Sequence, residues 1–408
     1  MLSLVQVCLI VLWATSPASA QALGGHPQDP EWRAFRNRYL AADGRVIDTA
    51  NNGISHSESQ GYGMFFAAHF ADRPNFERLW GWTQHNLSRA QDGLFAWRYD
   101  PRGNSPVTDQ NNATDGDIFI AWALFAAAER WDIPEYRAAA TRIAEDLLRC
   151  CVTEVNGRMI LLPGTAGFRS AEGTVVNLSY YVFPAFRALS RLVSDRRWAR
   201  LERDGLELIR EAAFGRWRLP PDWLLLPARG GPVVPAPSWP ARFSWDALRI
   251  PLNLAWGRMD HEALEAARRF WSDPGHPRRP PAWVDLRQNQ IPPYAGHAGV
   301  RAVHALILLR EGEASGISIR VADAPDYFGA AIVLQVRIAA TAPEEPPAEE
   351  PVEAARRLPL RDRIAEIGSS ILARIPKRER EKTESPPWEE SQQVRGVAPG
   401  LRGLVPPR

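Results

Sequence analysis

The sequence lacks the features that favour a highly charged partner, a disulfide-bonded fold or a membrane-spanning protein. Its 49 Lys and Arg residues nearly balance its 47 Asp and Glu residues, and the formal net charge of +2 does not indicate nucleic acid or a membrane surface as a partner. Cysteine is scarce: Cys8 lies in the first apolar segment, and Cys150 and Cys151 are adjacent, which argues against a disulfide framework. Stability must therefore come from a core, which the 45% of hydrophobic residues are sufficient to form.

Long apolar runs are also missing, apart from one near the first residue. Residues Leu2 to Trp13 carry no charge and are followed by Ala18-Ser19-Ala20, a pattern typical of a secretory signal peptide cleaved after Ala20. No Lys or Arg precedes the run, so only the N-terminal amine supplies positive charge there. Because the run is short for a membrane span and no later stretch approaches one, we expect a periplasmic or secreted protein with no transmembrane segment after signal removal.

The composition changes near residue 342, where proline, glutamate and arginine begin to dominate. Such a segment buries too little apolar surface to order itself, so we predict one folded domain over residues 21–341 and a mostly disordered tail over residues 342–408. Part of the tail places apolar residues on one helical face, namely Leu360, Ile364, Ile367, Ile371 and Ile375. Two interpretations stay open: a marginal helix without a partner, or a helix that forms on docking to a partner or membrane.

Helical periodicity dominates the predicted domain, and few stretches alternate as strands do. The exceptions are short, such as Met159–Leu162 and Thr174–Asn177. Predicted helices lie between Pro30 and Gly44, before His69, around Phe76 and Trp80, and over residues 118–131, 136–150, 181–192, 198–214, 245–255, 261–271, 299–310 and 326–340. Counted in pairs, these helices approach the twelve of a double ring. We therefore predict an all-α fold, an (α/α)6 barrel in which six helical hairpins form a toroid.

The first candidate catalytic acid is Glu58, in the stretch Ser55-His56-Ser57-Glu58-Ser59-Gln60-Gly61-Tyr62-Gly63-Met64. Small hydroxyl residues, an amide and two glycines surround the carboxylate, and an apolar run follows directly. This pattern indicates a loop that delivers one acid to the mouth of a buried helix. Alone, it is equally typical of an N-cap and a first-turn carboxylate that the helix dipole favours.

Two further acids stand at loop-to-helix junctions beside aromatic or amide residues. Asp115 precedes the apolar helix at 118–131, and Asp246 lies in Phe243-Ser244-Trp245-Asp246-Ala247-Leu248-Arg249. Hydrolysis of a glycosidic bond needs a protonated acid for the leaving oxygen and a carboxylate that activates water or attacks carbon, while aromatic rings hold the sugars. Three such acids therefore favour a glycosidase.

The same three segments resemble motifs of glycoside hydrolase family 8, most closely its branch of periplasmic endoglucanases associated with bacterial cellulose synthesis. The resemblance covers roughly residues 30–335. Ser57 to Met64 is similar to the family segment that holds the proton donor, residues 113–117 to the family signature, and residues 244–249 to the segment of the general base. The resemblance implies that Glu58 is the proton donor and Asp246 the general base. It implies that Asp115 holds the substrate or, in the alternative, acts as the nucleophile.

The predicted substrate-binding side chains lie in or near these motifs, and most are aromatic, although any single aromatic residue is equally compatible with the core. They are Gln60, Tyr62, Trp97, Tyr180, Tyr181, Trp245 and Arg249. No cofactor is expected, and no metal. Counted from Asp109, the positions where a calcium loop needs glycine and glutamate hold Thr114 and Ile120. His56 and His69 are expected to be structural, because neither has a second ligand at suitable spacing.

We therefore expect an inverting endo-β-1,4-glucanase whose partner is a β-1,4-glucan chain, with a cellulose synthase complex as a candidate second partner. One alternative is the same machinery on chitosan, xylan or mixed-linkage glucan, and another is a non-catalytic glucan-binding assembly factor. Two residues depart from the family pattern: Ser59 stands where glycine is usual, and Trp245 where tyrosine is frequent. We expect the first to narrow the approach to Glu58 and the second to change one aromatic wall.

Overall fold

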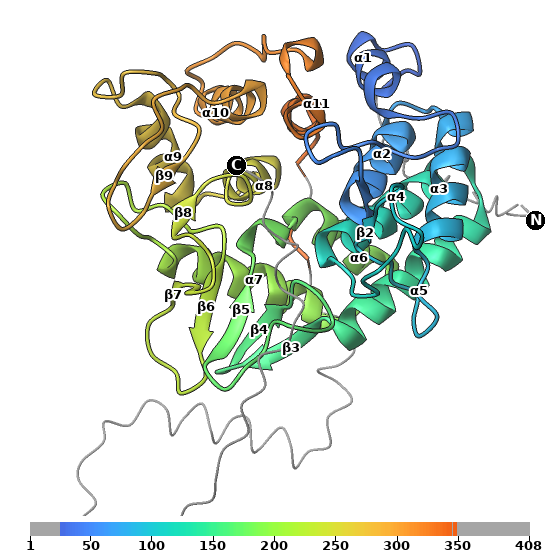
Figure 1. The fold of residues 1–408 in the computed structure, drawn as a ribbon, viewed down its shortest axis with the longest axis horizontal. Coiled ribbons are helices and arrows are strands. Elements are labelled where there is room, and N and C mark those ends of the chain that lie inside the picture. Colours follow the sequence, from blue (N-terminus) through green and yellow to red (C-terminus); the bar gives the residue numbers. More distant parts are fainter. Residues whose placement is uncertain (1–24, 345, 349–408) are drawn as a thin grey trace, which may run out of the picture.

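The computed structural model describes residues 25–344 and 346–348, so the predicted signal peptide and most of the predicted tail, including Leu360 to Ile375, lie outside the described residues. This part of the chain forms eleven α-helices, of which six surround the middle of the molecule and five lie outside them (Figure 1). The inner helices are α2 (Ser57–His69), α4 (Thr114–Trp131), α6 (Phe183–Leu192), α8 (Arg249–Trp256), α10 (Ala298–Arg310) and α11 (Tyr327–Thr341). The outer helices are α1 (Pro30–Tyr39), α3 (Arg73–Leu87), α5 (Pro134–Cys150), α7 (Arg196–Glu211) and α9 (Glu262–Ser272).

The N-terminal ends of the inner helices meet at one end of the ring. Arg249, in the first turn of α8, contacts Glu58 in the first turn of α2 and Asp115 in the first turn of α4. His297, the N-cap of α10, contacts Phe328 in the first turn of α11. The loops that precede these helices therefore converge, and each loop can contribute side chains to one site.

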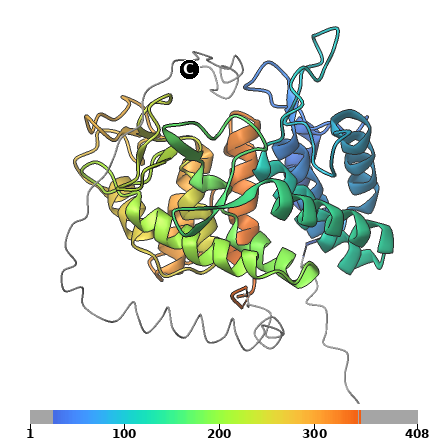
Figure 2. The same cartoon turned by 90° about the horizontal axis from the view of Figure 1, so that it is seen from below.

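The C-terminal ends of the inner helices meet at the opposite end, which Figure 2 shows side-on. Arg310, the last residue of α10, donates to the carbonyl of Ala255 in α8 and to that of Ala339 in α11. Arg187 of α6 donates to the carbonyl of Gly257, the C-cap of α8. These arginines satisfy carbonyl groups that helix ends leave without an intrahelical partner. The two ends of the ring are therefore chemically different.

An aromatic cluster lies between the two ends. The ring centroids of Phe65 in α2 and Trp122 in α4 are 4.3 Å apart, and Trp256 in α8 lies 5.7 Å from the first and 5.3 Å from the second. All three side chains are buried. Such contacts add to the burial of apolar surface that holds the helices together.

The strands are short and lie in the connections between helices. Three antiparallel sheets have two strands each: β1 (Ser55–His56) pairs with β2 (Arg98–Tyr99), β3 (Val152–Val155) pairs with β4 (Arg158–Leu161), and β8 (Arg242–Phe243) pairs with β9 (Val284–Asp285). A fourth antiparallel sheet has three strands, with β6 (Leu224–Pro227) between β5 (Gly173–Val176) and β7 (Val234–Pro235). The β1–β2 pair fixes the chain just before α2, and the β8–β9 pair fixes the chain just before Asp246. Two acid-bearing segments are thus anchored at their N-terminal sides.

The predicted ring of helical hairpins is confirmed, with local differences at several helix ends. The 3-10 turn η2 (Val321–Asp323) stands in the connection where a sixth outer helix is expected. The helix predicted from Tyr181 begins at Phe183, because a proline takes one of its first two positions. The helix predicted from Trp245 begins at Arg249, because residues 245–248 form a turn. α11 ends at Thr341, next to the predicted domain boundary.

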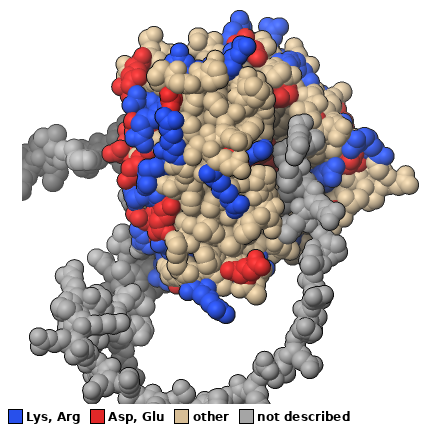
Figure 3. All heavy atoms as spheres, turned by 60° about the vertical axis from the view of Figure 1, so that its left-hand side comes forward, with Lys and Arg blue, Asp and Glu red and all other residues tan. Residues whose placement is uncertain are grey.

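Charged side chains are unevenly distributed over the face in Figure 3. On the face in Figure 3 they gather mainly along one edge, and the centre of the face carries few of them. On this face the acidic and basic side chains are interspersed along that edge. None of the helices in the described ranges is long and apolar enough to cross a membrane.

Candidate active site

Glu58 and Asp115 come together because α2 and α4 cross at very short range, and glycine makes this crossing possible. A Cβ atom on Gly116 would lie 2.7 Å from the backbone nitrogen of Glu58. A Cβ atom on Gly61 would lie 2.8 Å from the Cβ of Phe119. Non-bonded atoms do not approach so closely, so a larger residue at either position would push the helices apart.

One guanidinium group joins the three predicted acids. Nη1 of Arg249 lies 2.5 Å from Oε2 of Glu58 and 2.9 Å from Oδ2 of Asp115, and Nη2 donates to Oδ1 of Asp246 at 2.8 Å. Nη1 also lies 3.1 Å from the hydroxyl oxygen of Tyr62, whose side chain is buried beneath the acids. The Arg249 side chain is 5% exposed, so its charge is poorly screened and offsets the repulsion between the carboxylates.

The two aspartates have raised pKa values, and the three acids differ in exposure. Burial raises the pKa of Asp115 to about 7, with Arg249 opposing the change and the charge of Glu58 adding to it. Burial also raises the pKa of Asp246, again opposed by Arg249 and supported by Glu58. The side chains of Asp115, Glu58 and Asp246 are 3%, 14% and 26% exposed. Water therefore reaches Asp246 most easily, and Asp115 least.

Asp222, which the sequence did not lead us to predict, holds the turn that carries Asp246. Its Oδ1 accepts from the backbone nitrogens of Ser244 and Ala247 at 3.0 and 2.8 Å, and its Oδ2 accepts from the hydroxyl of Ser244. Burial and the charge of Asp246 raise the pKa of Asp222 to about 7. Asp222 precedes Trp223, so an acid beside an aromatic residue, the signal used for the other acids, was present here too.

His56 and Asp48 stand behind Glu58. Nδ1 of His56 accepts from the backbone nitrogen of Ser59 at 3.1 Å and lies 3.7 Å from Oε1 of Glu58. Nε2 of His56 lies 3.3 Å from Oδ2 of Asp48. Burial alone lowers the pKa of His56, but the hydrogen bond to Asp48 and the charge of Glu58 outweigh it and raise the pKa. The N-cap of α2 is thus His56 and not Ser57, in keeping with the structural role expected for this histidine.

Two predicted aromatic residues lie on the α8 side of the acids. The ring of Tyr180 lies under the guanidinium of Arg249, with its centroid 5.5 Å from Cζ. Trp245 directly precedes Asp246, and its side chain is 41% exposed. The Trp245 ring stacks on His297 with centroids 4.9 Å apart. An exposed indole that a second ring holds in place offers a flat apolar surface next to a carboxylate.

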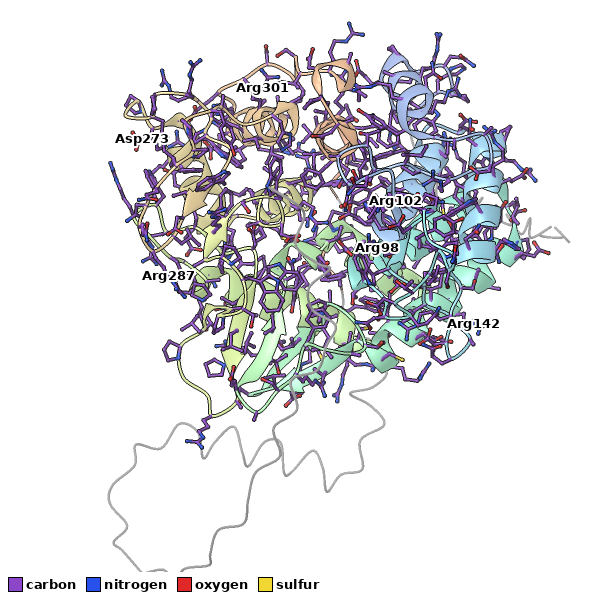
Figure 4. The ribbon with its side chains drawn as sticks, viewed as in Figure 1. Arg98, Arg102, Arg142, Asp273, Arg287 and Arg301 are labelled. Atoms are coloured by element: carbon purple, nitrogen blue, oxygen red, sulfur yellow. The ribbon has the colours of Figure 1, made fainter. Side chains whose placement is uncertain are left out.

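Trp97 lies on the α2 side, in the connection before α4. Its carbonyl accepts from the backbone nitrogen of Ser57 at 3.0 Å, and its indole nitrogen donates to Asp109 at 2.8 Å. The guanidinium of Arg98 lies over its ring at 5.9 Å. Arg98 and Arg102, labelled in Figure 4, come from this same connection. The connection is therefore fixed beside the first turn of α2.

Two predicted substrate-binding residues belong to the core instead. Gln60 is 0% exposed, and its side chain accepts from the backbone nitrogen of Val46 at 2.7 Å and donates to Thr83 at 3.0 Å. Tyr181 is also 0% exposed, and its hydroxyl accepts from the backbone nitrogen of Leu161 at 3.0 Å. Because these polar groups already bind the protein and no part of either side chain is accessible, we assign both residues a structural role.

We expected Ser59 to narrow the approach to Glu58, but the structure places its side chain elsewhere. Its hydroxyl accepts from the backbone nitrogen of His56 at 3.1 Å, which completes a capping box at the start of α2, and it donates to the carbonyl of His56 at 2.8 Å. The side chain is fully buried at the helix end. The described ranges contain no group of three or more His, Cys, Asp or Glu side chains placed to hold a metal ion.

The geometry provides the parts that hydrolysis of a glycosidic bond requires. Acids from α2, α4 and the turn before α8 face one guanidinium, Asp246 is the most accessible to water, and aromatic rings flank them on two sides. A pair of carboxyl groups held apart in this way can supply a proton to a leaving oxygen and activate water. Fold and site together define a glycosidase built on a helical ring.

Comparison with known proteins gives the family. The sequence profile described as Glycosyl hydrolases family 8 matches residues 2–342, and the chain belongs to this family of glycoside hydrolases. It is 41% identical over 310 residues to a probable endoglucanase of Novacetimonas hansenii, across 76% of this chain and 90% of the relative. It is 40% identical over 279 residues to an endoglucanase of Cellulomonas uda, across 68% and 77% of the two chains.

A solved structure agrees with the fold. The endo-beta-1,4-glucanase CMCax from Acetobacter xylinum matches with a TM-score of 0.72 and 41% sequence identity, over 76% of this chain and 96% of that chain. The predicted family and the predicted helical ring are thereby confirmed.

Proposed function

We propose that this protein is an endo-β-1,4-glucanase that cleaves internal bonds of a cellulose-like glucan with inversion at the anomeric carbon. The observation that carries the proposal is the contact of one guanidinium, that of Arg249, with Glu58, Asp115 and Asp246 at one end of the ring. The substrate class is supported by relatives named endoglucanase that are 40–41% identical over most of their length.

In the proposed reaction Glu58 gives its proton to the glycosidic oxygen as the bond to the anomeric carbon breaks. Asp246 accepts a proton from a water molecule whose oxygen forms the new bond to that carbon from the opposite face. The 26% exposure of the Asp246 side chain supports this role, because the base must meet water. Asp115 is buried and has a pKa of about 7, so near neutral pH it suits the binding of sugar hydroxyls. Trp97, Tyr180 and Trp245 would contact the sugar rings.

The bridging guanidinium sets an upper limit to the separation of Glu58 and Asp246, and this limit is compatible with inversion. Nη1 and Nη2 of Arg249 share one carbon atom, so the bound oxygens of Glu58 and Asp246 lie at most about 8 Å apart, on either side of a planar group. Inverting enzymes separate their carboxyl groups by roughly 6.5–9.5 Å and retaining enzymes by about 5–5.5 Å. The freshly released product should be the α-anomer by proton NMR, whereas a β-anomer would overturn Asp246 as base and favour Asp115 as nucleophile.

Carboxymethylcellulose provides the direct test of activity. The wild-type protein should release reducing ends and lower the viscosity early, which distinguishes internal from terminal cleavage. Glu58→Gln should fold and bind glucan but lose nearly all turnover. Glu77→Gln is the matched control, since Glu77 is exposed on the outer helix α3 and pairs with Arg73. Full activity of Glu58→Gln would remove Glu58 from the mechanism. Lack of wild-type activity here, with turnover on chitosan, xylan or mixed-linkage glucan, would favour another β-glycan.

We also propose where the protein acts and which second partner it has. The apolar run before Ala20 supports export to the periplasm or the medium, and a cellulose synthase complex is the proposed second partner. Fractionation of cells should find the activity outside the cytoplasm, and removal of residues 2–20 should retain it inside. Co-purification with the synthase would support the partnership, and its absence under mild detergent would count against it.

A further inference from the structure

The surface near Trp245 carries a second exposed aromatic residue, which the proposed reaction does not use. Among the described residues, the exposed large hydrophobic side chains are those of Val234, Trp245 and Tyr294, and Tyr294 is 52% exposed. Tyr294 lies in the connection between β9 and α10; Arg287 in this connection and Arg301 in α10 are labelled in Figure 4. A single exposed aromatic side chain is ordinary, whereas a supported group of them marks a binding surface.

Tyr294 belongs to a group of three side chains, together with Trp283 and Arg242. The indole nitrogen of Trp283 donates to the hydroxyl oxygen of Tyr294 at 3.1 Å. The Cζ atom of Arg242 lies 4.3 Å from the centroid of the Trp283 ring, which is a cation–π contact. Trp283 and Arg242 are both half-buried. The group therefore presents two aromatic rings, a hydroxyl and a guanidinium at the surface.

Backbone pairing holds this group in place. The register of β8 and β9 makes Arg242 and Trp283 diagonal neighbours on one face of the ladder, a separation that long side chains can span. An isolated antiparallel bridge between Pro281 and Ala295 fixes the chain next to Tyr294. Because the three side chains already contact one another, little further ordering is needed when a ligand binds to them.

The group adjoins the candidate active site through two of its chain segments. Arg242 lies three residues before Trp245, and Tyr294 lies three residues before His297, whose ring stacks on that of Trp245. Three residues of extended chain span at most roughly 11 Å, which is comparable to the length of a disaccharide unit in a β-1,4-glucan. Trp245 directly precedes Asp246, so the aromatic surface continues from Asp246 over Trp245 to Tyr294.

We propose that Tyr294, Trp283 and Arg242 form a distal sugar-binding site for the same glucan chain, a disaccharide length beyond Trp245. This inference rests on the proposed function and adds a contact remote from the acids. The apolar face of a glucose ring stacks on the ring of Tyr294. The Tyr294 hydroxyl accepts from Trp283, so its own proton can be donated to a sugar hydroxyl. The guanidinium of Arg242 carries its N–H donors around the edge of its plane and binds further hydroxyls.

A site at this distance from the acids acts on long chains only. A short oligosaccharide that occupies the positions beside Glu58 and Asp246 does not reach Tyr294, whereas a longer one gains the additional contact. Binding energy from sugars remote from the cleaved bond raises kcat/KM for the longer chain. The distal site therefore makes the enzyme prefer long chains over its own short products.

Cello-oligosaccharides of increasing length test the distal site in the full-length protein. The kcat/KM of the wild type should rise with chain length above the shortest oligosaccharide that it cleaves. Tyr294→Ala should lower kcat/KM for the longest oligosaccharides about tenfold and leave the value for the shortest one unchanged. Tyr294→Phe keeps the ring and should lose about two- to threefold. Gln288→Ala is the matched control, since Gln288 is exposed in the same connection, and it should behave as wild type.

Binding measured without turnover separates this inference from the proposed function. In calorimetric titration with cellohexaose, Glu58→Gln should bind, and Glu58→Gln/Tyr294→Ala should bind about tenfold more weakly. An active wild type with equal affinities of these two variants, or with the same loss in Tyr294→Ala at every chain length, would overturn the distal site alone. Weaker binding without Tyr294 in a protein that cleaves no β-glucan would overturn the proposed function alone. Absence of both activity and binding would overturn both.

Discussion

Replacement of Arg249 by methionine should leave three carboxylates together without their shared cation. Methionine has a similar length and no charge, so the change removes the contacts to Glu58, Asp115 and Asp246 with little change in packing. Removal of one partner from a buried ion pair costs about 3–5 kcal/mol, because the remaining charge stays desolvated. We expect a loss of that size in the free energy of unfolding at pH 8, and a large loss of kcat.

The loss should depend on pH in a defined direction. Arg249 lowers the pKa of both Asp115 and Asp246, so in its absence the pKa of Asp115 rises above about 7 and that of Asp246 rises as well. A carboxyl group whose pKa is higher in the folded than in the unfolded protein stabilises the fold at low pH, and this contribution is lost as pH rises through the folded pKa. The Arg249→Met deficit should therefore be larger at pH 8 than at pH 5.

Urea unfolding at both pH values, with kcat measured in parallel, checks this reasoning. Arg210→Met is the matched control: Arg210 lies on the outer helix α7, its side chain is 43% exposed, and it pairs with Glu207 and Glu262. Exposed pairs contribute about 0–1 kcal/mol, so this control should be nearly neutral at both pH values. An Arg249→Met protein as stable as wild type at pH 8, or one with its larger deficit at pH 5, would refute the electrostatic account of the site.

Three further predictions concern the parts around the acids. Gly116→Ala should lower the free energy of unfolding by about 1–3 kcal/mol and reduce kcat. Gly81→Ala is the control, because Gly81 lies in α3 and an added Cβ would have no atom within 4 Å. This control should raise the free energy of unfolding by about 1 kcal/mol in the same urea titration. Asp222→Ala should lower kcat about tenfold in steady-state kinetics, because the backbone nitrogens of Ser244 and Ala247 lose the oxygen that accepts from both; an unchanged kcat would show that the turn holds without it. Trp245→Ala should raise KM for a soluble glucan and Trp245→Tyr should not; equal KM values would separate Trp245 from sugar binding.

The fold was predictable from sequence because its signals are local. Apolar periodicity marked nearly every helix, and glycine and proline marked most boundaries. The start of α8 was missed because the turn before it depends on Asp222, which lies 22 residues or more away from the groups that it binds. No local pattern contains that interaction.

The site was predictable in its residues but not in their contacts. Glu58, Asp115 and Asp246 could be selected as acids beside aromatic residues, and the structure brings all three to Arg249. The short crossing of α2 and α4 that unites two of them follows from packing between distant glycines. Gln60 and Tyr181 have the side chains of sugar ligands, yet they are fully buried, and burial of single polar residues is not encoded in their neighbours along the chain.

The common direction of the inner helices polarises the whole ring. Each helix end carries a partial charge of about half an elementary charge, positive at the N-terminus. The ends of α2, α4, α6, α8, α10 and α11 together supply about three positive charges at one face, which equals in size the charge of three carboxylates. The opposite face receives the negative ends, and arginines gather there. A ring of the same helices in alternating directions would have no such polarity, and each acid would need a cation of its own.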